Sequence, residues 1–343
     1  MNAAAKPYDG KNKYIRITDI DEASSTYNNE DIVSPDGTLS ENYVVNERDI
    51  LLARTGASTG KSYLYQKSDG KLYFAGFLIR VNVAEHNPYF VFSQLHTHRY
   101  WQWVSIMSAR SGQPGINSQE YASFPIYTTS IIEENKISTL LSLIDERIAT
   151  QNKIIDKLQS LIGGIESGEL KNISKDGKWV KLGDICNITT GKLDANAMVD
   201  GGRYPFFTCA ETPYSINEYA FDTEALLISG NGANLGYINY YKGRFNAYQR
   251  TYVLDAFTED IHFIKFALKI FLPKRIAIEK STSNTPYIVM STLSEMKLFM
   301  PSRQIQKRLS TMMNLLENSL TNHRELLFNY SRMKEFLLQN MFI

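Results

Sequence analysis

The chain has 343 residues, 43% of them hydrophobic and 21% charged, and a formal net charge of +1. This composition is typical of a globular protein of about two domains, and it lacks the basic excess usual in a protein that binds nucleic acid alone. No apolar run reaches the ~18 residues of a membrane span, the N-terminus has no signal-peptide core, and two cysteines suit a reducing compartment. We therefore expect a cytoplasmic protein that does not enter a membrane.

An apolar run that ends in Gly-Ala-x-x-Gly occurs twice, at residues 50–60 and 226–236. Gly56 and Gly232 open the two motifs, and nearly half of the chain lies between them. Solenoid repeats span about 20–50 residues, so this period is too long for a solenoid. The sequence therefore predicts a duplicated module, with two similar surfaces in one chain.

The first copy alternates short apolar segments with Gly, Asn and Asp turns, a pattern that predicts strands. The aromatic stretch that follows is better explained as a helix, and a Gly-Gln-Pro-Gly loop comes after it. The expected elements are strands at 13–17, 49–54, 62–66 and 72–83, a helix at 86–105 and a loop at 111–115.

From residue 131 to about 170, apolar residues recur at steps of three and four, which predicts a long helix with a heptad seam. The second copy repeats the plan after a polar linker at 171–177. It has expected strands at 204–208, 226–229, 237–241 and 248–254, a helix at 261–280, a loop at 281–284 and a closing helix.

The two long helices have their apolar seams in the same register. Each seam position of the first helix corresponds to one of the second at a constant difference in residue number, which is the difference between Ile144 and Leu316. We call this constant difference the repeat offset. The seam positions are Ile144, Ile148, Gln151, Ile155 and Leu158, then Leu316, Leu320, His323, Leu327 and Tyr330. We expect an antiparallel coiled coil with Gln151 and His323 as a polar layer at its centre. An alternative to the coiled coil is that each helix packs only on its own domain. An alternative to the polar layer is that both side chains reach solvent from a frayed seam. From Ile137 to Ile165, the seam of the first helix covers 28 steps. At about 1.5 Å per residue it is roughly 42 Å long, or about 12 base pairs of B-DNA.

Several segments resemble the specificity subunit of type I restriction–modification enzymes. They include Trp-Val-Lys-Leu-Gly-Asp-Ile at 179–185, the start of the second module, and the segments 14–20, 48–56, 202–207, 228–233 and 248–253. Residues 133–137 resemble the start of the family's conserved helix, and residues 304–309 are a looser version. The resemblance covers nearly the whole chain.

The resemblance implies an α+β fold with two β-rich target recognition domains, each followed by a conserved spacer helix. The expected boundaries are 1–127 and 173–301 for the recognition domains, and 128–172 and 302–343 for the helices. It also implies a non-catalytic DNA-reading subunit for a bipartite double-stranded target, which docks two modification (methyltransferase) subunits. A restriction (translocase and nuclease) subunit is a further candidate partner. The first domain has no counterpart of residues 179–202, so we expect it to be shortened.

DNA contacts require Arg, Lys, Asn, Gln or Ser side chains on loops, where they can reach base edges or phosphates. The candidates are Arg16, Arg54, Ser58, Lys61, Arg110, Gln113, Arg203, Asn231, Asn234, Arg250, Ser283 and Asn284. Each of them could equally be a solvated surface residue or stabilise a turn.

The sequence gives less support to a catalytic function. Residues 56–62 lack the first glycine of a phosphate-binding loop. Residues 284–287 (Asn-Thr-Pro-Tyr) differ at one position from the Asn-Pro-Pro-Tyr motif of amino-methyltransferases, but no cofactor loop accompanies them. The five histidines form no metal site with the cysteines. We therefore expect no catalytic residue, cofactor or metal. The alternatives are a stand-alone adenine methyltransferase that uses Asn284 to Tyr287, and a coiled-coil adaptor with two protein-binding modules.

Overall fold

The computed structural model describes residues 1–109, 113–172, 177–280 and 287–342. Its contacts divide the chain into two units, residues 1–153 with 324–343 (unit 1) and residues 154–323 (unit 2). Two long helices, α4 (Ile131–Asn172) and α7 (Arg303–Met341), each contribute one part to each unit. No helix in the described part of the chain has the length and apolar character needed to cross a membrane.

Unit 1 is built around β4, whose five residues are all buried. Side chains alternate along a strand, so Ile50 and Leu52 face a core with Phe92 and Tyr100, whereas Leu51 faces a second core. The strands form the sheet β5-β4-β7 and the pairs β1-β3 and β2-β6. Their bounds are β1 Ala4–Pro7, β2 Lys13–Ile15, β3 Val33–Asp36, β4 Asp49–Ala53, β5 Ser62–Leu64, β6 Leu72–Phe74 and β7 Leu78–Asn82, and the short helices are α1 Pro88–Gln94, α2 His98–Met107 and α3 Ser118–Ala122.

Two elements expected in this unit are each divided. The strand expected at 72–83 is two strands, because the chain turns where Leu78 N donates to Ala75 O (2.9 Å). The helix expected at 86–105 is α1 and α2, because Thr97 caps a new helix by accepting a hydrogen bond from Tyr100 N. Strands β1 and β3 were not expected.

Unit 2 contains a six-stranded sheet in the order β11-β10-β13-β12-β14-β9 and a separate pair, β8-β15. Its strands β13-β12-β14 have the same order as β5-β4-β7 of unit 1, so the sequence repeat is also a repeat of the fold. The bounds are β8 Gly177–Lys181, β9 Asn187–Thr190, β10 Tyr204–Phe207, β11 Tyr214–Ile216, β12 Phe221–Ser229, β13 Ile238–Ala247, β14 Thr251–Asp255, β15 Lys297–Pro301, α5 Ile261–Lys280 and α6 Met290–Ser294. Helix α5 has the expected bounds and packs on one face of the sheet through Phe263 and Leu268.

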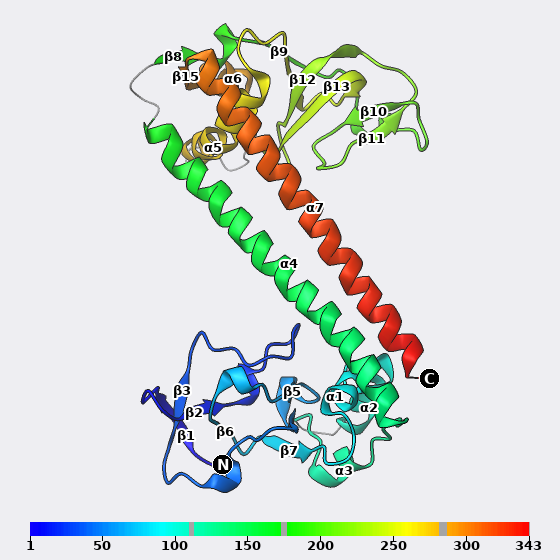
Figure 1. Cartoon of the computed structure of the whole chain (residues 1–343). Coiled ribbons are helices and arrows are strands. Elements are labelled where there is room, and N and C mark those ends of the chain that lie inside the picture. Colours follow the sequence, from blue (N-terminus) through cyan, green and yellow to red (C-terminus); the bar gives the residue numbers. More distant parts are fainter. Residues whose placement is uncertain (110–112, 173–176, 281–286, 343) are drawn as a thin grey trace. The chain divides into compact units, whose positions relative to one another are not determined.

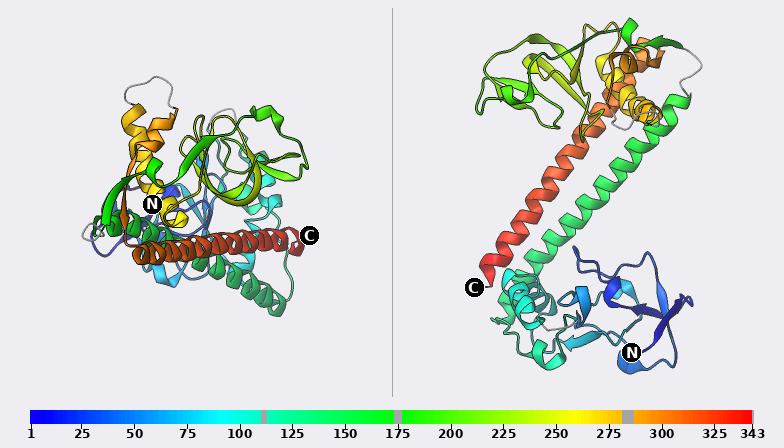
Figure 2. Two further views of the ribbon diagram at one scale, coloured as in Figure 1. Left: turned by 90° about the horizontal axis from the view of Figure 1, so that it is seen from above. Right: turned by 180° about the vertical axis from the view of Figure 1, so that it is seen from behind.

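The long helices pair antiparallel within each unit (Figures 1 and 2). In unit 1, Leu141 near the start of α4 packs with Leu338 near the end of α7. In unit 2, Ile165 near the end of α4 packs on the core that contains Leu309 and Met313 of α7. The expected seam residues of both helices are buried or half-buried. The expected fold class, with two β-containing parts each followed by a long helix, is confirmed.

Candidate nucleic-acid interface

The two Gly-Ala-x-x-Gly segments form the same tight turn between two antiparallel strands, β4 to β5 in unit 1 and β12 to β13 in unit 2. Gly56 and Gly232 have φ of 69° and 80°, and Gly60 and Gly236 have φ of 94° and 84°. These angles lie in the left-handed region, which costs glycine little and other residues more. The glycines of the motif are therefore explained by the turn, with no need for a bound phosphate.

Close packing gives the last glycine of each motif a second role. A Cβ at Gly60 would lie 2.7 Å from Val104 Cγ1, and a Cβ at Gly236 would lie 2.6 Å from Ile276 Cδ1. The repeat offset relates Val104 to Ile276. Equivalent helices, α2 and α5, therefore hold the two turns against their units in the same way.

The same pair of hydrogen bonds connects each turn to neighbouring loops. In unit 1, Ile116 N donates to Arg54 O at 2.9 Å, and in unit 2, Ile288 N donates to Gly230 O at 2.9 Å. From the other side, Arg54 N donates to Phe77 O (3.0 Å) and Gly230 N donates to Arg250 O (2.8 Å). Each unit thus presents one turn between two further loops that are distant in sequence.

In unit 1, this arrangement brings together Arg54, Ser58 and Gln113. Arg54 follows β4 and is exposed, Ser58 lies half-buried in the turn, and Gln113 is exposed. The Gln113 amide nitrogen lies 3.1 Å from where a Cβ would stand on Gly56, so this side chain covers the turn. The three residues therefore lie on or beside the same turn.

Two other candidates in unit 1 bind carboxylates. Arg16 donates from Nε and one terminal nitrogen to the two oxygens of Asp19, at 2.8 and 2.7 Å. Lys61 Nζ lies 3.1 Å from Glu22 Oε2, and the Lys61 side chain is only 18% exposed. A bidentate pair has well-defined geometry and contributes to folding, so Arg16 has a structural role that its sequence context did not reveal.

Phe77 is a surface residue that the sequence analysis missed. It is 60% exposed, and its carbonyl oxygen accepts from Arg54 N. The pattern gave no signal for it, because residues 72–83 were expected to form one strand. An exposed aromatic side chain beside an arginine can stack on a base or contact a thymine methyl group.

In unit 2, Asn231, Asn234 and Arg250 gather around Cys209. The Cys209 thiol donates to Asn231 Oδ1 (3.0 Å), and Asn234 Nδ2 donates to Cys209 O (3.1 Å). The Cys209 thiol also lies 3.6 Å from Arg250 O. The bond to Cys209 uses one of the two N–H groups of the Asn234 amide, so the side-chain oxygen can accept from a ligand and the second N–H can donate to one.

Arg203 is exposed and precedes β10, whereas Cys209 follows the other end of this strand. At about 3.3 Å per residue, six residues of extended chain separate the two positions by roughly 20 Å. Among the described residues, no contact brings Arg203 to the turn. The candidates Arg110, Ser283 and Asn284 lie outside the described residues, as does most of the methyltransferase-like motif at 284–287.

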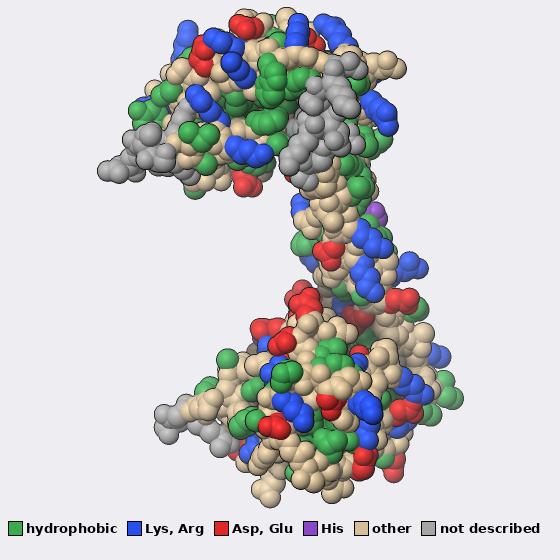
Figure 3. Space-filling model, turned by 90° about the vertical axis from the view of Figure 1, so that its left-hand side faces the viewer, with side chains coloured by type: hydrophobic (Ala, Val, Ile, Leu, Met, Phe, Trp, Pro, Cys, Tyr) green, Lys and Arg blue, Asp and Glu red, His purple; other side chains and the backbone are tan. Residues whose placement is uncertain are grey.

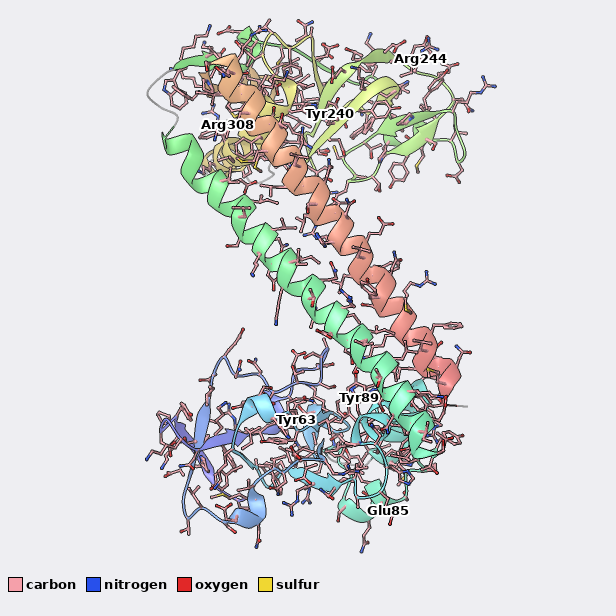
Figure 4. All side chains as sticks on the ribbon, in the orientation of Figure 1. Tyr63, Glu85, Tyr89, Tyr240, Arg244 and Arg308 are labelled. Carbon is pink, nitrogen blue, oxygen red and sulfur yellow. The ribbon has the colours of Figure 1, made fainter. Side chains whose placement is uncertain are left out.

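Tyr240 and Arg244 of β13, both labelled in Figure 4, form polar pairs with residues of β12. Tyr240 Oη donates to Glu224 Oε1 at 2.6 Å, and burial together with this bond raises the pKa of Tyr240 to about 12. Arg244 Nε donates to Asp222 Oδ2 at 2.9 Å, and its guanidinium stacks over Tyr219. These groups stabilise the sheet, so a DNA contact from β13 would compete with pairs already formed.

The charged side chains form no continuous basic stripe over the described residues on the face drawn in Figure 3; basic groups lie there among apolar and acidic ones. In the described part of the chain, no group of three or more His, Cys, Asp or Glu side chains could hold a metal ion. The face drawn in Figure 3 thus has no concentration of basic side chains over the described residues.

The comparisons identify the second half of the chain. Residues 175–327 match the family described as the type I restriction modification DNA specificity domain. The EcoDI specificity subunit of Escherichia coli is 40% identical over 148 residues, which are 42% of this chain and 33% of that subunit. A putative type I specificity subunit of Mycoplasma genitalium is 23% identical over 63% of this chain and 61% of its own length. The chain therefore spans about a third of the first relative and less than two thirds of the second.

The fold has a solved counterpart as well. The crystal structure of the S subunit of a type I restriction–modification system from M. genitalium aligns with 99% of this chain and 90% of its own, with a TM-score of 0.74 and 18% sequence identity. This likeness shows the fold, including both long helices. Residues 175–327 thus match the type I restriction modification DNA specificity domain, and the chain is similar in sequence and fold to specificity subunits of type I restriction–modification systems.

Proposed function

We propose that this chain is the sequence-specific DNA-binding subunit of a type I restriction–modification enzyme, reads a bipartite target and catalyses no reaction itself. In this proposal, residues 1–127 and 173–301 are the two recognition modules, and residues 128–172 and 302–343 are spacer helices. We place its action in the cytoplasm. The observation that carries the proposal is the duplicated turn, which has the same hydrogen bonds in both units.

The chemistry of the two turns suits the reading of bases. Arginine can form two hydrogen bonds with guanine, and asparagine or glutamine can form two with adenine. Unit 1 presents Arg54 with Gln113, and unit 2 presents Asn231 with Asn234. The two sets differ, which supports two half-sites of different sequence.

Affinity for DNA would then depend on partner proteins. With a net charge of +1, the chain can neutralise few phosphates by itself. We propose that modification subunits share this task, and that a restriction subunit joins the same assembly.

Equivalent exposed leucines support two copies of the modification subunit. Leu143 on α4 is 53% exposed and Leu315 on α7 is 65% exposed, and the repeat offset relates them. Apolar side chains exposed on a helix at matching places can bind the same partner surface twice. Leu143→Arg or Leu315→Arg should each remove one of two bound copies, counted by native mass spectrometry.

The proposal is tested by purification of the full chain alone and with a co-expressed modification subunit. We expect sequence-specific binding of bipartite DNA by the complex, weak binding by the chain alone, and no methyl transfer or cleavage by the chain alone. Methyl transfer by the isolated chain, or a complex that binds all DNA sequences equally, would overturn the proposal.

A further inference from the structure

Two carboxylates occupy the same place in the two halves of the chain. The repeat offset relates Asp145 on α4 to Glu317 on α7, and their side chains are 35% and 29% exposed. Each binds a helix of its own module that lies against the long helix, α1 in unit 1 and α5 in unit 2. The attachment of the module to the long helix is therefore duplicated together with the turn.

In unit 1, the carboxylate bridges three helices. Tyr89 Oη of α1 donates to Asp145 Oδ2, and Lys334 Nζ of α7 lies 2.6 Å from Asp145 Oδ1. Tyr89 is labelled beside α4 in Figure 4. Burial and then the hydrogen bond to Asp145 raise the pKa of Tyr89, so the phenol remains a donor at neutral pH.

In unit 2, the equivalent carboxylate binds two lysines of one helix. Lys265 Nζ lies 3.5 Å from Glu317 Oε2, and Lys269 Nζ pairs with Oε1. Burial alone would raise the pKa of Glu317, but the two lysines outweigh it and the pKa is lowered. The attachment in unit 2 is therefore fully ionic, whereas that in unit 1 includes a neutral donor.

A second attachment lies about three helical turns earlier on each long helix, at Glu134 and Gln306. Glu134 Oε2 accepts from Asn87 N at 2.8 Å, and Gln306 Oε1 accepts from Asp260 N at 3.1 Å. With a pitch of about 5.4 Å, the two attachments are about 16 Å apart along the helix. One attachment alone would act as a pivot, and the second would stop rotation about it.

Packing leaves space beside the carboxylate attachments. In unit 1, a cavity of about 1050 Å³ lies between residues 21–26 and the long helices, and Tyr89, Trp101, Asp145 and Lys334 line it. In unit 2, a hollow of about 460 Å³ adjoins Lys265 and Lys269, but it lies within the module, because residues 236–240 and α5 line it. In unit 1, side chains do not fill the space between the module and the long helices, so the polar attachment there limits how far the module can turn.

We propose that Asp145 and Glu317 are positioning residues that fix the angle of each recognition module on the long helices, and thereby the number of base pairs accepted between the half-sites. This inference rests on the proposed function. It assigns these residues no contact with DNA, so their loss should change the tolerated spacer and leave the half-site sequences unchanged.

The test uses the full chain in complex with its co-expressed modification subunit. DNA libraries carry the selected half-sites with spacers of different lengths, and the measured quantity is the affinity ratio between the best spacer and one a base pair longer or shorter. Asp145→Asn and Glu317→Gln keep the side-chain shape but weaken the attachment. Glu146→Gln, a change at the exposed neighbour of Asp145, is the matched control.

We expect each variant to reduce spacer discrimination about tenfold, the equivalent of one charge-assisted hydrogen bond, with the same half-sites selected. Added salt should reduce discrimination more in the unaltered chain than in Glu317→Gln, because salt screens the ionic attachment that this variant has already lost. A spacer profile identical to that of Glu146→Gln would overturn the inference while leaving the proposed function intact. Tyr89→Phe provides a second variant if Asp145→Asn does not fold. Failure of the unaltered complex to prefer any bipartite site would instead refute the proposed function.

Discussion

Replacement of Glu134 by alanine should strongly destabilise unit 1. The carboxylate is fully buried, its Oε1 lies 2.8 Å from His86 Nδ1, and its Oε2 accepts from Asn87 N at 2.8 Å. A charge-assisted hydrogen bond contributes about 1.5–3 kcal/mol, and a buried N–H left without a partner costs about 1–3 kcal/mol. From these values, we expect Glu134→Ala to lower the free energy of unfolding by about 3 kcal/mol. Glu134→Gln, which introduces the residue found at the equivalent position 306, should lower the free energy of unfolding by about 1 kcal/mol.

The assay is urea unfolding followed by tryptophan fluorescence in a Trp179→Phe background, which leaves Trp101 and Trp103 of unit 1 as probes. Burial raises the pKa of Glu134, but its hydrogen bonds to Asn87, His86 and Thr129 outweigh burial, so the pKa is lowered. The stability that the Glu134 carboxylate contributes is therefore complete above the usual glutamate pKa, and it is lost as pH falls through the lowered pKa of the folded state. Glu133→Ala, at a half-exposed neighbour, is the control. An equal effect of both alanine variants would refute the reasoning.

Three further predictions follow from particular contacts. Burial and the charge of Lys334 lower the pKa of His96 to about 4, so the unfolded chain binds the extra proton first as pH falls below about 6.5. We therefore expect the free energy of unfolding, measured with urea, to be about 2 kcal/mol lower at pH 5 than at pH 7, and His96→Phe should remove this loss. The bond from Asn234 Nδ2 to Cys209 O holds the Asn234 side chain in place, so Asn234→Asp, which has no donor for this bond, and Asn234→Leu should each weaken about tenfold a preference for a base with an exposed amino group in one half-site; an unchanged selection profile in both variants would count against it. We propose from the shared heptad register that Gln151 and His323 form a polar layer, so replacement of both by leucine should raise the melting temperature and widen the accepted spacer, since such a layer fixes register at a cost in stability; no change in either would contradict this proposal.

The sequence pattern correctly predicted those elements that are determined by neighbouring residues in the chain. The duplicated turn was predicted because only glycine adopts φ near 69–94° easily at both of its ends. Helix α5 was predicted at 261–280 from its length and apolar content. The division of residues 72–83 occurs at the local turn closed by Leu78 N and Ala75 O, and Gly76 N within it donates to Met1 O (2.8 Å). The sequence pattern did not predict the division, because a contact with a residue as distant as Met1 leaves no local signal.

The same limit applies to the candidate site. The sequence repeat indicated the turn, and the structure places Arg54 and Asn231 beside the two equivalent turns, although the backbone counterpart of Arg54 is Gly230. The roles of Cys209, Phe77 and Asp19 arise from contacts between segments that are far apart or from local ion pairing, so residue type alone could not assign them. Asp145 and Glu317 could be recognised as equivalent only when the repeat offset was combined with the side chains that each of them binds in the structure.

Exchange of one module tests the central claim, that the two units read separate halves of a DNA target. Residues 179–301 are replaced by the equivalent segment of another specificity subunit, and the complex with modification subunits is used to select bound sequences from a random DNA library. We predict that one half-site changes to that of the donor protein while the other half-site remains the same. A change in both half-sites, or in neither, would contradict the account.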